Sequence, residues 1–142
     1  MATLTLSTKL PAPVAVVWEE LRHIDRHVHW MADAESITFT TEQHEGVGTQ
    51  FRCRTKVGPL VTTDVMTITA WEPERTMGVR HSGLITGEGA FHLVAKGDAT
   101  DMTWAETLIF PWWAGGPLGA LVATPILRAI WRRNLRRLQQ RF

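Results

Sequence analysis

Tyrosine is absent from the 142-residue sequence, and cysteine occurs only once, as Cys53. A single cysteine excludes an internal disulfide, which suits a reducing compartment. No apolar run reaches the roughly 18 residues that a membrane-spanning helix requires. Residues 1–9 also lack the basic and apolar regions of a signal peptide. We therefore expect a cytoplasmic protein without stable insertion into a membrane.

Acidic residues are absent beyond Glu106, although the formal net charge of the chain is only +1. The C-terminal segment is therefore a basic run. Such a run is usually the solvated face of an amphipathic helix, and it less often binds an anionic surface. Terminal arginines alone are weak support for nucleic-acid binding, so we expect no nucleic-acid partner. The last fifteen residues contain six of them: Arg128, Arg132, Arg133, Arg136, Arg137 and Arg141.

Motifs for phosphate binding, nucleophilic catalysis and metal binding are also missing. Gly46-Val47-Gly48 is too short for a phosphate loop, and Cys53 has no evident histidine partner. His23 and His27 would share one face of a helix, yet no third ligand follows at a suitable spacing. We therefore expect neither a metal nor a cofactor.

Alternation of apolar and polar residues predicts strands along most of the chain. Residues 4–10 alternate leucine with polar side chains, and the same period of two recurs between residues 35 and 110. Short turns such as Gly58-Pro59 and Ser82-Gly83 separate the later segments. Because parallel pairs need long crossovers, these short gaps predict an antiparallel meander.

Helical spacing appears near both ends of the chain. Apolar residues at helical spacing follow Pro13, and a second short helical piece fits residues 24–31. Near the C-terminus, Thr124-Pro125 is typical of an N-cap with a first-turn proline, so we expect the long final helix to start there. Residues 118–122 are compatible with an earlier helical turn that Pro125 kinks or breaks.

These elements predict one α+β domain over residues 1–142, with about seven strands in the order strand, two helices, six strands, helix. An antiparallel sheet with one apolar face has to cover that face, and only the C-terminal helix is long enough. A curved sheet wrapped around one helix leaves a gap where the two surfaces diverge. We expect this gap to hold a small apolar ligand.

Short segments along nearly the whole chain have the order and spacing of one known superfamily. They are Pro11-Ala12-Pro13, Val17-Trp18, His29-Trp30-Met31, Gly46-Val47-Gly48-Thr49 with Phe51, Trp71-Glu72-Pro73, Gly87-Glu88-Gly89-Ala90-Phe91 and Trp104-Ala105-Glu106. The chain thereby resembles the START-like (SRPBCC) superfamily of polyketide cyclase/dehydrase and lipid-transport proteins. The resemblance implies a helix-grip fold with an internal cavity for apolar ligands, in which some members catalyse cyclisation or dehydration. Aromatase/cyclase members often have a cavity tyrosine, which this chain lacks.

Three ionisable residues, Asp64, His81 and Glu106, share strand parity with apolar neighbours and are predicted to face the cavity. Such groups must be paired, hydrated or shifted in pKa, and they mark candidate sites. A one-residue slip would instead turn them to solvent. They are the candidate catalytic residues, with His81 as general acid or base, Asp64 orienting it and Glu106 assisting across the cavity.

The expected register brings the first two candidates together. A hairpin with Trp71 opposite Thr76 places Met66 opposite His81. Asp64 is then diagonal to His81, about 7–8 Å away at the backbone and within reach of its imidazole.

The next two hairpins are expected to bring Glu106 to the same site. They place Gly89 beside His81 and Phe91 beside Glu106. The two ionisable side chains would then stand about 10 Å apart, two strand spacings, with Gly89 leaving room between them.

Apolar walls are expected from both layers. Before the final helix, Trp112-Trp113 could form a lip that admits ligand or meets a membrane, or the two indoles could cap the core. We expect at least one indole to pack, because exposed indoles are costly. The full set of expected ligand contacts is Met66, Ile68, Val79, His81, Phe91, Trp104, Glu106, Ile126 and Ile130.

Three functions remain open at this level. The first is a binding module that carries or sequesters a small hydrophobic molecule, such as a lipid, a polyketide-like compound or an aromatic compound. The second is a cyclase/dehydratase-type enzyme that uses His81. The third is a protein that docks on a membrane or partner through the arginine face of its last helix.

Overall fold

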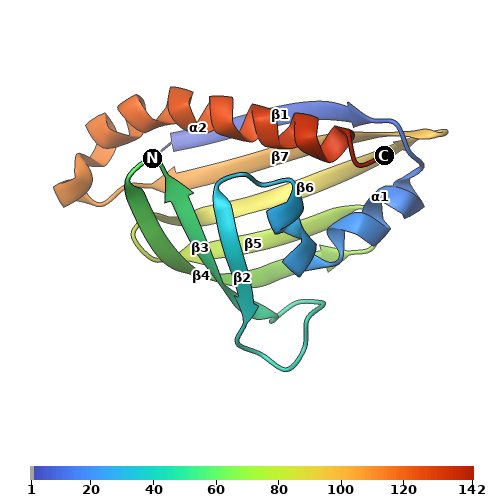
Figure 1. Cartoon of the computed structure of the whole chain (residues 1–142), viewed down its shortest axis with the longest axis horizontal. Coiled ribbons are helices and arrows are strands. Elements are labelled where there is room, and N and C mark those ends of the chain that lie inside the picture. Colours follow the sequence, from blue (N-terminus) through green and yellow to red (C-terminus); the bar gives the residue numbers. More distant parts are fainter. Residues whose placement is uncertain (1) are drawn as a thin grey trace.

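The computed structural model describes residues 2–142, apart from the side chain of Ala114. A curved sheet forms one layer and the long C-terminal helix lies along it (Figure 1). The elements in chain order are β1 (Ala2–Leu10), α1 (Val14–Leu21), the 3-10 helix η1 (Ile24–His29), β2 (Ala34–Phe39), β3 (Gln50–Val57), β4 (Leu60–Glu72), β5 (Thr76–Ser82), β6 (Thr86–Lys96), β7 (Ala99–Ile109), the 3-10 helix η2 (Trp112–Ala114) and α2 (Gly116–Gln139).

The seven strands form one antiparallel sheet in the order β1-β7-β6-β5-β4-β3-β2. Strands β3 to β7 follow one another through short turns. Strand β1 pairs with β7 and forms one edge of the sheet, and β2 forms the other. In β7, every second side chain is buried, from Thr100 to Leu108. This alternation is what the sequence pattern predicts, and the α+β helix-grip fold is confirmed.

Helix α2 begins earlier than expected. It runs without interruption from Gly116 to Gln139, so the prediction that Thr124-Pro125 starts it is wrong. The chain turns into the helix at Gly115, whose φ of 93° favours glycine, and Pro117 is its first-turn proline. Pro125 lacks an N–H and cannot bond the preceding turn, while the Thr124 hydroxyl donates to the Ala120 carbonyl at 2.6 Å. Among the described residues, no helix has the length and apolarity needed to cross a bilayer.

The pairing of β4 with β5 contains an irregularity that the sequence does not announce. Trp71 lies opposite Met77, so the expected pairing of Trp71 with Thr76 is wrong by one residue. The register then shifts between Ile68 and Ala70. Because the shift compensates for the error at the turn, Met66 does lie opposite His81, as expected.

Aromatic rings join the sheet to the helices in the core. Trp104 on β7 stacks on Trp131 of α2, with ring centroids 4.9 Å apart. Phe91 on β6 and the fully buried Trp30 approach Trp104 edge-on, at 5.3 and 6.1 Å. Such edge-to-face and stacked pairs add stability beyond their area. They fix the position of the middle of α2 over the sheet.

Polar contacts also tie α2 to the rest of the chain. The fully buried Asn134 donates to the Asp33 carboxylate at 2.7 Å and accepts from the Ala32 amide at 3.0 Å. Three of the arginines are likewise engaged, because Arg137 donates to the His29 carbonyl, Arg128 donates to the Thr5 carbonyl at 3.4 Å, and Arg141 pairs with Glu20 at 2.6 Å. Arg132, Arg133 and Arg136 are exposed, as a solvated helix face would be.

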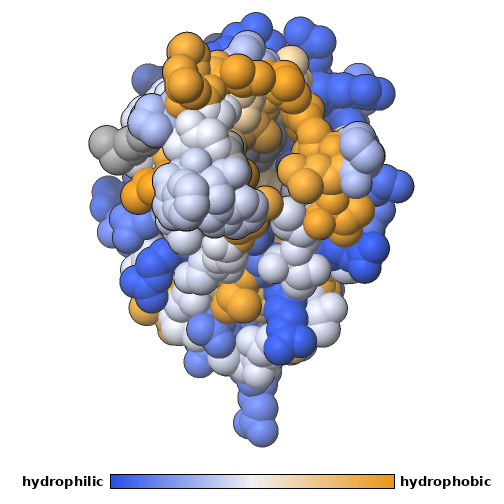
Figure 2. Space-filling view, turned by 90° about the vertical axis from the view of Figure 1, so that its left-hand side faces the viewer, coloured by the Kyte–Doolittle hydropathy of each residue, from blue (hydrophilic) through white to orange (hydrophobic). Residues whose placement is uncertain are grey.

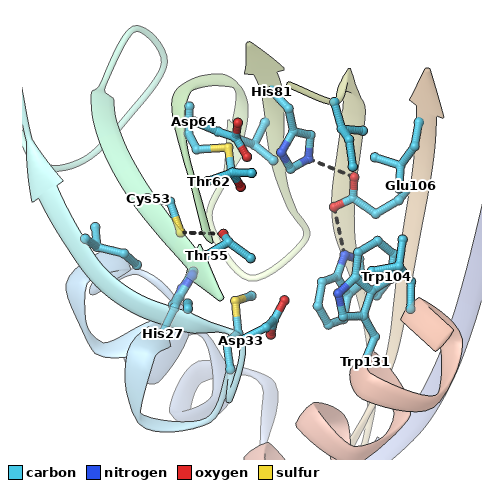
Figure 3. A pocket seen from close by; sticks show the side chains of 18 of the residues that line it. His27, Asp33, Cys53, Thr55, Thr62, Asp64, His81, Trp104, Glu106 and Trp131 are labelled. Atoms are coloured by element: carbon cyan, nitrogen blue, oxygen red, sulfur yellow. Dashed lines mark hydrogen bonds and ion pairs between the residues drawn. The ribbon is translucent and has the colours of Figure 1, made fainter. Parts of the chain in front are cut away.

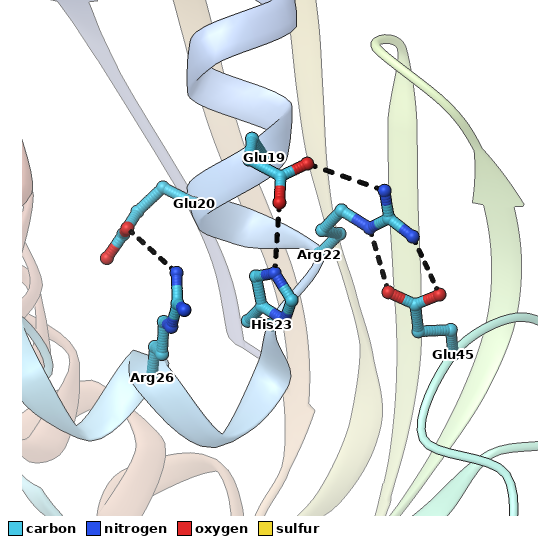
Figure 4. A network of polar contacts seen from close by, with 6 residues as sticks. All are labelled: Glu19, Glu20, Arg22, His23, Arg26 and Glu45. Carbon is cyan, nitrogen blue, oxygen red and sulfur yellow. Dashed lines mark hydrogen bonds and ion pairs between the residues drawn. The ribbon is translucent and has the colours of Figure 1, made fainter.

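The histidines near residue 25 have separate structural roles. His23 bonds Glu19 at 3.1 Å, beside the paired contact of Arg22 with Glu45 that ties α1 to the loop after β2 (Figure 4). His27 instead points into the core and donates from Nε2 to the Leu21 carbonyl at 2.8 Å. Within residues 2–142, no three His, Cys, Asp or Glu side chains converge as metal ligands.

Protonation of His27 is expected to destabilise the protein in mild acid. Burial lowers the pKa of His27 to about 4 from 6.5, outweighing the opposing effect of its bond to Leu21. The folded pKa lies below the unfolded one, so this contribution to stability is complete above pH 6.5 and is lost as the pH falls toward 4. By about pH 5, the loss amounts to about 2 kcal/mol of unfolding free energy.

Urea unfolding at about pH 7 and about pH 5 measures this loss. The variant His27→Gln keeps a donor for the Leu21 carbonyl and should lose less stability between the two pH values than the wild type. The control variant, His29→Gln, changes an exposed histidine and should behave as the wild type. Equal pH dependence in all three proteins would contradict the assignment to His27.

Candidate functional site

A cavity of about 370 Å³ lies between the sheet and the first half of α2. It exists because α2 packs along β1 and β7, at one side of the sheet, while the strands from β3 to β5 curve away from it. Figure 3 shows many of the side chains that line it. Most of the lining residues are apolar: Ile24, Met31, Ala34, Ile37, Phe51, Val57, Leu60, Met66, Ile68, Met77, Val79, Ile85, Ala90, Phe91, Trp104, Leu108, Phe110, Ala123, Ile126, Leu127 and Trp131.

His81 and Glu106 meet inside this cavity. Nε2 of His81 lies 2.9 Å from Oε2 of Glu106, and the other carboxylate oxygen accepts a bond from the Trp104 indole at 2.9 Å. The Glu106 side chain is 5% exposed and that of His81 is 16% exposed. The carboxylate is therefore fixed from two sides (Figure 3). Glu106 makes the orienting contact with His81 that the sequence analysis gave to Asp64.

Gly89 makes the approach of these two side chains possible. The expected cross-strand neighbours are wrong by two residues, because Gly89 lies opposite Glu106, Gly87 opposite His81 and Phe91 opposite Trp104. A Cβ at Gly89 would stand 2.2 Å from the Glu106 side chain. The missing side chain leaves room for the carboxylate to pass over β6 and reach β5. A slip of two residues keeps every side chain on its face, so the cavity orientation survives the error.

The environment raises the pKa of His81. Burial opposes the charged imidazole, but the hydrogen bond to Glu106, its negative charge and the charge of Asp64 together outweigh that effect. Asp64 has a raised pKa of its own, because burial exceeds the opposing influence of the Leu84 amide and His81. Its Oδ1 is buried without a hydrogen-bond partner and lies against Gly83. The site therefore favours a proton on either group.

The wall formed by β3 and β4 carries polar groups that the sequence analysis missed. Cys53, Thr55 and Thr62 line the cavity, and burial raises the pKa of the Cys53 thiol. Strand parity could have found Cys53 and Thr55, because they alternate with outward arginines. Asp33 and His27 also line the cavity. His27 lies in η1, where the sequence analysis expected a helical piece but treated this histidine only as a possible metal ligand, and Asp33 lies in the connection before β2.

The structure brings together most of the residues expected to contact a ligand. The exception is Ile130, which packs against the core instead of lining the cavity. The stripe of α2 that lines the cavity is Ala123, Leu127 and Trp131, each one turn apart, with Ile126 beside it. The expected residues that line the cavity are Met66, Ile68, Val79, His81, Phe91, Trp104, Glu106 and Ile126, together with the candidate Asp64.

Neither indole of Trp112-Trp113 is packed in the core. Trp112 is 87% exposed and Trp113 is 63% exposed, so the expectation that at least one packs is wrong. Both belong to the short 3-10 turn η2 between β7 and α2, which leaves the sheet before the helix returns over it. The space-filling view shows a hollow at this end of the molecule, bordered by apolar surface (Figure 2).

Residues 1–142 match the family described as polyketide cyclase / dehydrase and lipid transport. The chain belongs to this family, and the START-like resemblance is confirmed. No curated protein matches the sequence significantly.

Solved structures of the same architecture cover nearly the whole chain. The protein TTHA0849 from Thermus thermophilus gives a TM-score of 0.82 at 16% identity, over 99% of this chain and 96% of that one. The Zhui aromatase/cyclase from a Streptomyces species gives 0.76 at 16% identity, over 99% and 92%. Ara h 8.0201 gives 0.73 at 13% identity, over 98% and 95%. At these identities the likeness establishes the fold alone.

Replacing Glu106 with glutamine is expected to lower the pKa of His81. The change keeps an acceptor for Trp104 but removes the charge that favours the imidazolium, so burial becomes the dominant influence. NMR titration of the imidazole measures the shift. Glu88→Gln, an exposed carboxylate on the neighbouring strand, is the matched control and should leave the His81 titration unchanged. An unchanged pKa in Glu106→Gln would contradict the proposed coupling.

Proposed function

We propose that the protein binds a small, uncharged, largely apolar molecule in the cavity between the sheet and α2. The observation that carries this proposal is the cavity itself, about 370 Å³ with a predominantly apolar lining. This size and make-up are typical of ligand sites in proteins, which are apolar with a few placed polar groups. Family membership agrees with it, because the family description names polyketide cyclases and lipid transport. We still expect the cytoplasm as the compartment, since a single cysteine, the buried free Cys53, suits a reducing environment.

The charges in the lining support an uncharged ligand. Three carboxyl groups, those of Asp33, Asp64 and Glu106, line the cavity, and none of the described lining residues is a lysine or an arginine. The imidazole of His81 already pairs with Glu106, so a ligand with its own carboxylate would find no unpaired cation and would stand near other carboxyl groups in a medium of low dielectric. A hydroxyl, phenol or ketone can exchange hydrogen bonds with His81 or Asp64 without that penalty. The ligand class is therefore a neutral lipid, polyketide-like or aromatic compound.

Filling the cavity from the helix is expected to abolish binding. Ala123→Phe adds a ring to a residue of α2 that lines the cavity, without removing a core contact. The affinity for the neutral fluorescent probe N-phenyl-1-naphthylamine should fall about tenfold or more, because the ring occupies the ligand's space. The matched control is Ala129→Phe, at an exposed position of the same helix. It should bind as the wild type, and thermal melts should show both variants folded. Undiminished binding by Ala123→Phe would place the probe elsewhere.

A second function, acid–base catalysis in the cavity, is favoured by the contact between His81 and Glu106. Their 2.9 Å bond gives the imidazole a fixed orientation, and its raised pKa suits exchange of a proton near neutral pH. In a cyclase/dehydratase-type reaction, neutral His81 would remove a proton next to a ligand carbonyl and return it to an oxygen. Glu106 would stabilise the imidazolium formed, while Asp64 adds a further carboxyl group to the site.

Proton exchange in a simple aromatic ketone separates the two functions. The catalytic proposal expects the protein to accelerate deuterium incorporation next to the carbonyl of α-tetralone in heavy water. His81→Gln should reduce this acceleration by roughly 10²–10⁴-fold, while His92→Gln, which changes an exposed histidine of β6, should have no effect. NMR spectroscopy follows the exchange. Equal rates with the wild type and His81→Gln would leave the binding function alone.

A further inference from the structure

Three segments at one end of the molecule carry no charge. The antiparallel order brings the β3–β4 turn, the β5–β6 turn and the connection from β7 to α2 to the same end of the sheet (Figure 1). These segments, residues 57–63, 82–87 and 107–127, contain no charged residue, although 20% of the chain is charged. We call them the open end. The turns at the opposite end, Glu72–Arg75 and Lys96–Asp98, are both charged.

Large apolar side chains at the open end project into solvent. Figure 2 shows a hollow bordered by hydrophobic surface at this end, and no described part of the chain covers these side chains. On α2, the residues between them point inward, so the first half of the helix is apolar on both sides. Apolar patches of this kind mark interaction surfaces. The exposed fractions are 87% for Trp112, 63% for Trp113, 73% for Leu118, 71% for Leu121, 67% for Val122 and 53% for Leu60.

The charges behind the open end have the sign that suits an anionic lipid surface. Two acids directly adjoin the uncharged segments, Asp64 and Glu106, and both line the cavity. On the outer surface, the nearest charges along these segments are the bases Lys56, Arg80 and Arg128 and one acid, Glu88, which lies opposite Arg80 on the next strand. Along α2, Arg128 follows Leu118 by about 15 Å. Apolar side chains of an interfacial helix enter about 5–10 Å below the headgroups, so Arg128 would remain at headgroup level.

We propose that the open end docks on an anionic lipid bilayer, with η2 and the start of α2 inserted among the lipid headgroups. Residues that line the cavity, such as Leu60 and Ile126, belong to this end. The mouth of the cavity then faces the bilayer, and an apolar ligand can pass between lipid and protein without crossing water. Docking itself rests only on the exposed surface, whereas this passage also rests on the proposed binding function.

Vesicle sedimentation tests the docking without any ligand. The wild type should bind vesicles of phosphatidylcholine that contain about a quarter phosphatidylserine, and more weakly those of phosphatidylcholine alone. The double variant Trp112→Ser, Trp113→Ser should lose about tenfold or more in partition coefficient. Its control, Val16→Ser with Val94→Ser, removes side chains of 50% and 54% exposure from α1 and from the far half of β6 and should bind as the wild type.

Quenching by lipids with brominated chains gives an independent measurement. Fluorescence of the wild type should be quenched on vesicle binding, and the tryptophan double variant should lose that quenching. A second variant, Leu121→Ser with Val122→Ser, should also weaken binding, because both side chains are exposed on α2. Undiminished binding by both variants would overturn the proposal. So would a wild type that self-associates through these residues, with the variants monomeric and no protein on the vesicles.

Discussion

The structure depends on one constraint: a curved sheet has a single concave apolar face, and only one helix is long enough to cover it. Helix α2 meets this constraint at one side, along β1 and β7, where Trp131 stacks on Trp104. The buried Asn134 fixes the same half of the helix to the loop before β2. The other half of the helix lines the cavity through Ala123, Ile126 and Leu127. The cavity is the space that one helix leaves under a sheet wider than itself.

Burial in that space determines what the polar side chains can do. An isolated carboxylate there would be costly, and Glu106 avoids the cost through bonds with both His81 and Trp104. The absence of a side chain at Gly89 is what lets these groups meet across β6. The same arrangement serves binding and catalysis, because a fixed imidazole of raised pKa can hold a ligand oxygen or move a proton. Ligand binding and acid–base catalysis would therefore use the same cavity and differ in the molecule that enters it.

Strand parity was enough to predict the fold and most of the cavity lining, whereas the local backbone geometry could not be predicted from the sequence. Parity survives a two-residue slip, which is why His81, Phe91 and Glu106 line the cavity although their expected partners were wrong. The register shift near Thr69 has no composition signal. The helix start was misplaced because Thr124-Pro125 satisfies the rules for an N-cap, while the true start at Gly115 and Gly116 looks like a loop. Exposure of the indoles depends on where that loop leaves the sheet, and periodicity contains no information on this.

The central claim is that the cavity holds an apolar ligand without a negative charge. Displacement of N-phenyl-1-naphthylamine by 1-decanol and by decanoate at neutral pH tests it most directly, because the two competitors share a chain length and differ in charge. The account predicts that decanol displaces the probe at a concentration about tenfold or more below that of decanoate, since Asp33, Asp64 and Glu106 line the cavity. Displacement by decanoate at an equal or lower concentration would contradict the account.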